Sequence, residues 1–121
     1  MKYQGFIWAG FLVEDLVSAI AFYSDVLGLP LLGKGKDWAH FDAGNGAMLE
    51  LLTEGVASLE PKKSGQQSII PGLRVDDFDA AITGLKQKGV HFIGDIGEYA
   101  GTRWAQFTDP EGNRLEIKEI L

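Results

Sequence analysis

The chain has 121 residues, of which 45% are hydrophobic and 23% charged, and it contains no cysteine. That length suits one globular domain, 1–121, and the missing cysteines exclude disulfides, thiolate nucleophiles and cysteine-based metal sites. A formal net charge of −6 repels phosphate backbones and anionic lipids, so we expect no nucleic acid and no membrane partner. The apolar run 6–13 is too short to cross a bilayer, which makes the cytoplasm the expected location.

The first half of the chain predicts one helix flanked by strands. Asp15 is a suitable N-cap because its side-chain oxygen can accept from the free amides of the first turn, and Gly28 suits a left-handed helix end. Between them, apolar residues recur at helical spacing: Leu16, Ile20, Tyr23 and Leu27. Segments with strand character surround this helix, over residues 5–12, 30–34, 38–42 and 47–52.

Residues 54–67 are polar, lack periodicity and include a proline and a Ser-Gly pair. We therefore predict a linker here, between a first module over 5–53 and a second over 68–121.

The second half repeats the plan of the first. Asp76 or Asp77 is expected to cap a helix with the apolar stripe Phe78, Ile82 and Leu85, ending at Gly89. Strands are predicted over residues 68–75, 90–93, 102–108 and 114–120, and 109–112, Asp-Pro-Glu-Gly, fits a type I turn. The sequence Trp-Ala-His-Phe at 38–41 aligns with Trp-Ala-Gln-Phe at 104–107, which places Glu50 on Glu116. A duplicated βαβββ unit follows from this match.

Strand alternation separates a helix-covered face from a free face in each module. The phenylalanines at 41 and 107 belong under the helices. Trp38, His40, Trp104 and Gln106 then lie on the free faces. Matching tryptophans in both copies are typical of a ligand cleft or a subunit contact, because large amphipathic rings serve both.

These motifs resemble the vicinal oxygen chelate superfamily, which includes glyoxalase I, extradiol dioxygenases, fosfomycin resistance enzymes and bleomycin resistance proteins. The resemblance covers the whole chain and rests on 13–16, 22–29 and 107–116, which read VEDL, FYSDVLGL and FTDPEGNRLE. It implies an α+β fold in which two tandem βαβββ modules form a cupped mixed sheet with helices on the outer face.

In metal-dependent members of that superfamily, each module gives a histidine from its first strand and a glutamate from its last. The resemblance puts the glutamates at Glu50 and Glu116, but the histidine positions hold Trp8 and Ile70. Two carboxylates are a poor site for zinc, nickel or iron, so we expect no metal and no cofactor. His40 is expected to be a polar lining residue; a role as metal ligand is the less favoured alternative.

The two glutamates have three metal-free interpretations. We rank counter-charge or polar lining first, surface pairing with Arg74, Arg103 or Arg114 second, and proton transfer third.

The resulting hypothesis is a homodimeric protein similar to the bleomycin resistance proteins, which sequesters a cationic aromatic small molecule without a metal. The expected ligand-binding residues are Trp8, Trp38, His40, Glu50, Ile70, Trp104 and Glu116. The main alternative is a metal-dependent lyase, isomerase or dioxygenase of the same superfamily. A third reading is a pure interaction module in which the tryptophan face is a dimer contact.

Overall fold

The computed structural model describes all residues, 1–121, and divides into two compact units, Met1–Ala57 and Ser58–Leu121. The two units are described one at a time below.

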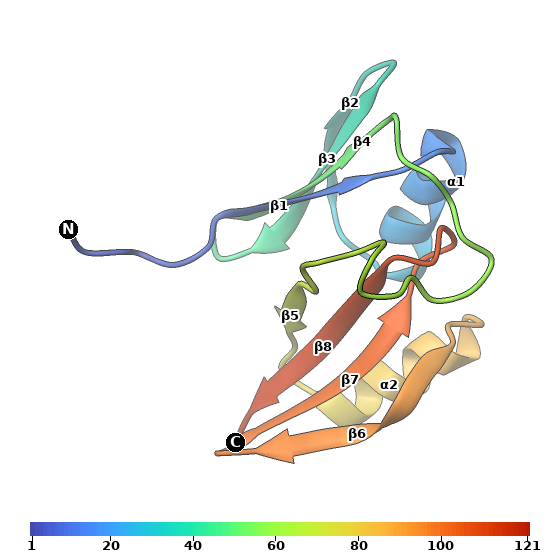
Figure 1. Ribbon diagram of the computed structural model, residues 1–121. Helices are drawn as coiled ribbons and strands as arrows, with labels where there is room; N and C mark the ends of the chain where they lie inside the picture. The colour runs from blue at the N-terminus through green and yellow to red at the C-terminus, as the bar shows by residue number, and fades with distance from the viewer. The chain divides into compact units, whose positions relative to one another are not determined.

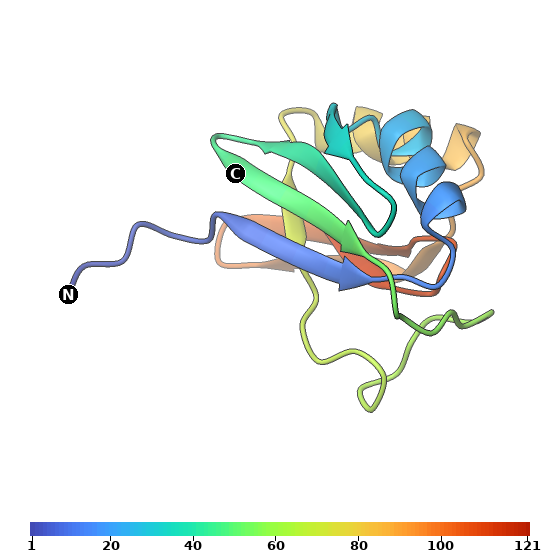
Figure 2. The ribbon, with the colours of Figure 1, turned by 90° about the horizontal axis from the view of Figure 1, so that it is seen from above.

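The first unit is one four-stranded sheet with a helix on one face (Figures 1 and 2). Its strand order is β1-β4-β3-β2, with β1 parallel to β4 and the other neighbours antiparallel. The helix packs against β3 and β4. The elements are β1 Trp8–Leu12, α1 Leu16–Ala21, the π-helix η1 Phe22–Val26, β2 Leu31–Lys34, β3 Trp38–Gly44 and β4 Ala47–Leu52.

The second unit has the same topology, with strand order β5-β8-β7-β6 and a parallel β5–β8 pair. Its elements are β5 Gly72–Arg74, α2 Phe78–Gln87, β6 Phe92–Tyr99, β7 Thr102–Thr108 and β8 Arg114–Ile120. Two tandem βαβββ modules of the α+β class are therefore confirmed. No helix is long and apolar enough to span a membrane.

The first helix begins where predicted but does not bury the predicted stripe. Asp15 caps it by accepting from the Ser18 amide at 3.2 Å and the Ser18 hydroxyl at 2.8 Å. The Ser18 hydroxyl and amide lower the pKa of Asp15. After Ala21 the chain widens into the π-helix, whose extra residue per turn rotates the following side chains. The buried residues are Ala19, Phe22 and Tyr23, so Tyr23 alone of the predicted stripe is buried, whereas Leu16, Ile20 and Leu27 stay partly exposed.

The second helix follows the prediction closely. Asp77, rather than Asp76, is the cap and accepts from the Ala80 amide at 3.0 Å. The predicted stripe is buried in full: Phe78, Ile82 and Leu85. Gly89 ends the turn with φ +86°, a left-handed conformation that residues with a side chain rarely adopt.

Five predicted strands have different bounds: β1 starts at Trp8, β2 at Leu31, β3 extends to Gly44, and the two largest differences are in the second unit. The strand expected over 68–75 is limited to β5, because Pro71 has no N–H for the ladder and contributes only its carbonyl, which accepts from the Glu116 amide at 3.0 Å. The strand expected over 90–93 instead runs through β6 to Tyr99. The register of β6 against β7 shifts between Ile93 and Gly97, and the strand continues across this irregularity. The sequence suggests a turn at this point because it contains glycine and aspartate.

Each sheet has one buried and one free face, as strand alternation predicts. The buried faces hold Phe41, Leu49, Leu51, Phe107, Leu115 and Ile117, each at most 2% exposed. In the first unit a cluster of aromatic rings completes the core. The ring centroids of Phe11, Phe22 and Phe41 lie 5.3–6.2 Å from that of Tyr23. The residues that alternate with these along each strand lie on the free faces.

The segment predicted as a linker packs against the turn that precedes β8. The Ser58 amide donates to the Glu111 carbonyl and the Lys62 amide to the Gly112 carbonyl, both at 2.9 Å. The Lys62 ammonium is buried and donates to Asn113 Oδ1 at 2.9 Å. Residues 58–67 therefore form part of the second unit.

Candidate ligand-binding site

Three side chains meet on the free face of the first sheet. Glu50 of β4 lies opposite Gly10 of β1 on one side and His40 of β3 on the other. The Trp8 indole Nε1–H donates to Glu50 Oε1 at 3.1 Å, and His40 Nε2 is hydrogen-bonded to Glu50 Oε2 at 2.5 Å. An ionised carboxylate can only accept, so the ring is the donor to it. Each carboxylate oxygen thus accepts one hydrogen bond from a ring.

Glycines make room for the two tryptophan rings of this face. The Trp8 ring reaches back over Gly10, where an added Cβ would lie 2.5 Å from Trp8 Cη2. The Trp38 ring similarly occupies the space above Gly33 and Gly35. A side chain at Gly10 or Gly35 would displace these rings, whereas a Cβ at Gly33 would make ordinary van der Waals contact with Trp38 at 3.6 Å.

Trp38 also packs on His40. Their ring centroids are 4.5 Å apart at an interplanar angle of 43°. Both tryptophans keep a substantial exposed surface, 51% for Trp8 and 37% for Trp38. The face therefore offers two aromatic surfaces on either side of a hydrogen-bonded carboxylate.

The charge of this face is acidic. The strands β1, β3 and β4 contain no lysine or arginine, whereas Glu50 and Asp42 both lie on the free side. The Glu50 side chain is only 18% exposed and His40 is 32% exposed. A partly desolvated carboxylate beside aromatic rings is suited to a cationic group.

The same residues do not fit a metal ion. The indole of Trp8 can only donate a hydrogen bond, and it stands where the family resemblance implies an imidazole ligand. Both Glu50 oxygens already accept from N–H groups. No group of three or more histidine, aspartate or glutamate side chains in the structure could hold a metal.

The predicted residues of the second module lie in the second unit and have different surroundings. Glu116 accepts from Gln106 Nε2 at 3.2 Å and lies 3.6 Å from the Lys118 ammonium. The Trp104 ring occupies the space above Gly97 and has the Lys118 ammonium 5.1 Å from its centroid. Ile70 precedes β5 and is 42% exposed. Lys118 is the residue that sequence reasoning passed over, although its alternation with Glu116 placed it on this face.

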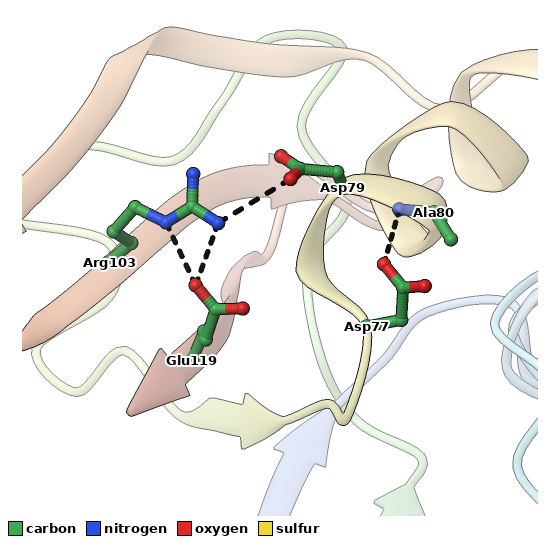
Figure 3. Close-up of polar contacts among 5 residues, drawn as sticks. All are labelled: Asp77, Asp79, Ala80, Arg103 and Glu119. Atoms are coloured by element: carbon green, nitrogen blue, oxygen red, sulfur yellow. Dashed lines mark hydrogen bonds and ion pairs between the residues drawn. The ribbon is translucent and has the colours of Figure 1, made fainter. Parts of the chain in front are cut away.

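Neither Glu50 nor Glu116 pairs with Arg74, Arg103 or Arg114, so the interpretation of these glutamates as partners of an arginine is wrong. The partners of Glu50 are rings, and those of Glu116 are an amide and a lysine. Arg103 instead binds Glu119, through Nε at 2.8 Å and Nη2 at 2.7 Å, with Asp79 at 3.6 Å (Figure 3). Glu119 raises the pKa of Arg103, and the guanidinium lies 4.7 Å from the Phe78 centroid. Arg103 of β7 thus links the first turn of α2, through Phe78 and Asp79, to the sheet.

Comparisons with known proteins agree with the fold. Residues 5–117 match the family model described as Glyoxalase/Bleomycin resistance protein/Dioxygenase superfamily. YraH of Bacillus subtilis strain 168, an uncharacterized protein, is 34% identical over 91% of this chain and 94% of its own. Metallothiol transferase FosB of Lysinibacillus sphaericus is 34% identical over 88% of this chain and 76% of its own.

Solved structures give the same picture. TnmS3, an antibiotic binding protein from Streptomyces sp. CB03234, superposes with a TM-score of 0.74 over 100% of this chain and 99% of its own, at 24% identity. A glyoxalase/bleomycin resistance protein/dioxygenase from Alicyclobacillus acidocaldarius gives 0.76 over 98% and 92%, at 23% identity.

Proposed function

This chain belongs to the Glyoxalase/Bleomycin resistance protein/Dioxygenase superfamily, and we propose that it binds a cationic aromatic small molecule on the free face of its first sheet without a metal ion. The ligand packs against Trp8 and Trp38 and places its positive charge near Glu50. His40 orients that carboxylate. The protein acts in the cytoplasm as a homodimer.

The observation that carries the proposal is the double hydrogen bond of Glu50. Trp8 and His40 hold the carboxylate in one orientation between two exposed rings, while no lysine or arginine of β1, β3 or β4 offsets its charge. A cation on an aromatic face gains about 0.5 to 2 kcal/mol. Orientation of the carboxylate before binding reduces the cost of ordering it on binding.

Calorimetric titration with proflavine, a planar aromatic cation, tests this proposal. We expect saturable binding that Trp38→Leu weakens about fivefold, which corresponds to roughly 1 kcal/mol of lost ring contact. Trp104→Leu, the same change at the matching position of the second unit, is the control and should leave the affinity unchanged. Equal affinities of Trp38→Leu and the unmodified protein, or no binding at all, would contradict the proposal.

A metal-dependent enzyme is the second candidate, favoured by the likeness to metallothiol transferase FosB and by the glutamates at both last-strand positions. Elemental analysis of protein purified without chelators separates the two. We expect substoichiometric zinc, nickel, manganese and iron, because Trp8 replaces an imidazole and Glu50 already accepts two N–H groups. One equivalent of any of these metals would favour the enzyme.

A further inference from the structure

The free face of the second sheet carries the opposite charge to that of the first. Paired residues of a ladder project to the same side, so Arg74 of β5 and Lys118 of β8, which are register partners, share the side of Arg114 and Glu116. Across β5, β7 and β8 this side has three cations and one carboxylate. That excess is unexpected in a chain with 17 acidic and 11 basic residues.

Lys118 has a defined position on this face. Its methylene chain lies over Gly72, where an added Cβ would be 2.6 Å from Lys118 Cδ. Its ammonium lies 5.1 Å from the centroid of Trp104 and 3.6 Å from a Glu116 oxygen. The side chain remains 40% exposed, so the ammonium is positioned by the protein and accessible to a ligand.

The two arginines leave their charge uncompensated. Arg114 donates to the Lys62 carbonyl and to Gln106 Oε1, both at 2.6 Å, and both acceptors are neutral. Arg74 is exposed, and its guanidinium has neither a hydrogen bond nor an ion pair with the protein. Glu116, the one carboxylate that β5, β7 and β8 contribute to this side, is shared between Lys118 and Gln106. The face therefore has unsatisfied positive charge.

We propose that this face binds the anionic group of a small organic molecule, a carboxylate or a phosphate, between Arg74 and Lys118. The guanidinium supplies a planar set of donors and the ammonium a point charge, a combination suited to an oxyanion. This inference goes beyond the binding of a cation proposed above, because it concerns the other unit and the opposite charge. The two copies of the repeat have thus specialised for groups of opposite sign.

The three tryptophans allow each face to be followed separately, because Trp104 alone lies in the second unit. In a proton–nitrogen NMR titration with phenyl phosphate, we expect the Trp104 indole signal to shift saturably while those of Trp8 and Trp38 stay in place. Benzylamine, which has the same ring and a positive charge, should not shift the Trp104 signal. Added salt should weaken phenyl phosphate binding, because these charges are partly exposed.

Charge-removing variants identify the cations involved. Arg74→Gln and Lys118→Gln should each weaken phenyl phosphate binding about two- to fivefold, as expected for partly exposed charge pairs. Lys36→Gln removes one positive charge from the first unit and should leave the affinity unchanged. An unshifted Trp104 signal, or equal affinities of all three variants, would overturn the inference. Neither result affects the calorimetric proflavine test, which compares Trp38→Leu with Trp104→Leu.

Discussion

Replacing Phe41 with alanine is expected to lower the free energy of unfolding by about 3 to 5 kcal/mol, the usual cost of removing a buried aromatic side chain. The Phe41 ring is fully buried and lies 6.0 Å from Tyr23, itself 0% exposed. Truncation would therefore leave a cavity inside a cluster of rings that has little room to collapse. Urea unfolding followed by circular dichroism measures the change.

The repeat and the segment before β1 supply two comparisons. Phe107→Ala should cost a similar amount, since Phe107 is equally buried at the corresponding position. Phe6→Ala should change stability by no more than about 0.5 kcal/mol, because Phe6 is 99% exposed. A Phe41 cost similar to that of Phe6 would mean that Phe41 is not a core residue.

Asp109→Ala is the second large loss, at about 3 kcal/mol or more, because the buried carboxylate accepts three hydrogen bonds. Its Oδ1 accepts from the amides of Glu111 and Asn113, and its Oδ2 accepts from the Asn113 side chain, each at 2.9 Å. The alanine variant would leave these buried donors without an acceptor. The same urea experiment measures the loss.

Asp42 of β3, an exposed aspartate just before the equivalent turn of the first repeat, is the control. Its side chain accepts only from the Gly44 amide, at 2.8 Å. We expect Asp42→Ala to cost no more than about 1 kcal/mol. Similar losses for the two aspartates would refute the view that the turn before β8 depends on its buried network.

The tight turn itself shows why that network is sensitive. Gly112 has φ +81°, and an added Cβ there would lie 2.5 Å from the Glu60 carbonyl oxygen. Residues 58–62 therefore pack directly on the turn. The sequence predicts the turn from its proline and glycine. It does not predict that residues 58–62 pack on the turn, because that segment has no hydrophobic periodicity.

Much of the fold is predictable because the two repeats encode it twice. Both helix caps, the strands β4, β7 and β8, and the division of side chains between faces follow from capping chemistry and alternation. The buried face of the first helix does not, because a 3.6-residue period assumes a regular α-helix. The π-helix at Phe22–Val26 breaks that assumption and brings Phe22 into the core.

The face on which the first-module candidates lie is predictable from sequence, but the hydrogen bonds between them are not. Alternation places Trp38, His40 and Glu50 on one face. The hydrogen bond from Trp8 to Glu50 depends on the register that sets Gly10 opposite Glu50 and on the space that this glycine leaves. A glycine two residues after a strand tryptophan was the available signal. The charge of the second face depends on Lys118 and Arg74, which the register of β5 and β8 places on the side of Glu116.

Binding by the first unit without a metal is the central claim, and its most direct test is a proton–nitrogen NMR titration of chelator-treated protein with proflavine. The account predicts saturable shifts of the Trp8 and Trp38 indole signals, a stationary Trp104 signal, and the same affinity after zinc is added. Shifts that appear only with zinc present, or an absence of shifts at Trp8 and Trp38, would contradict it.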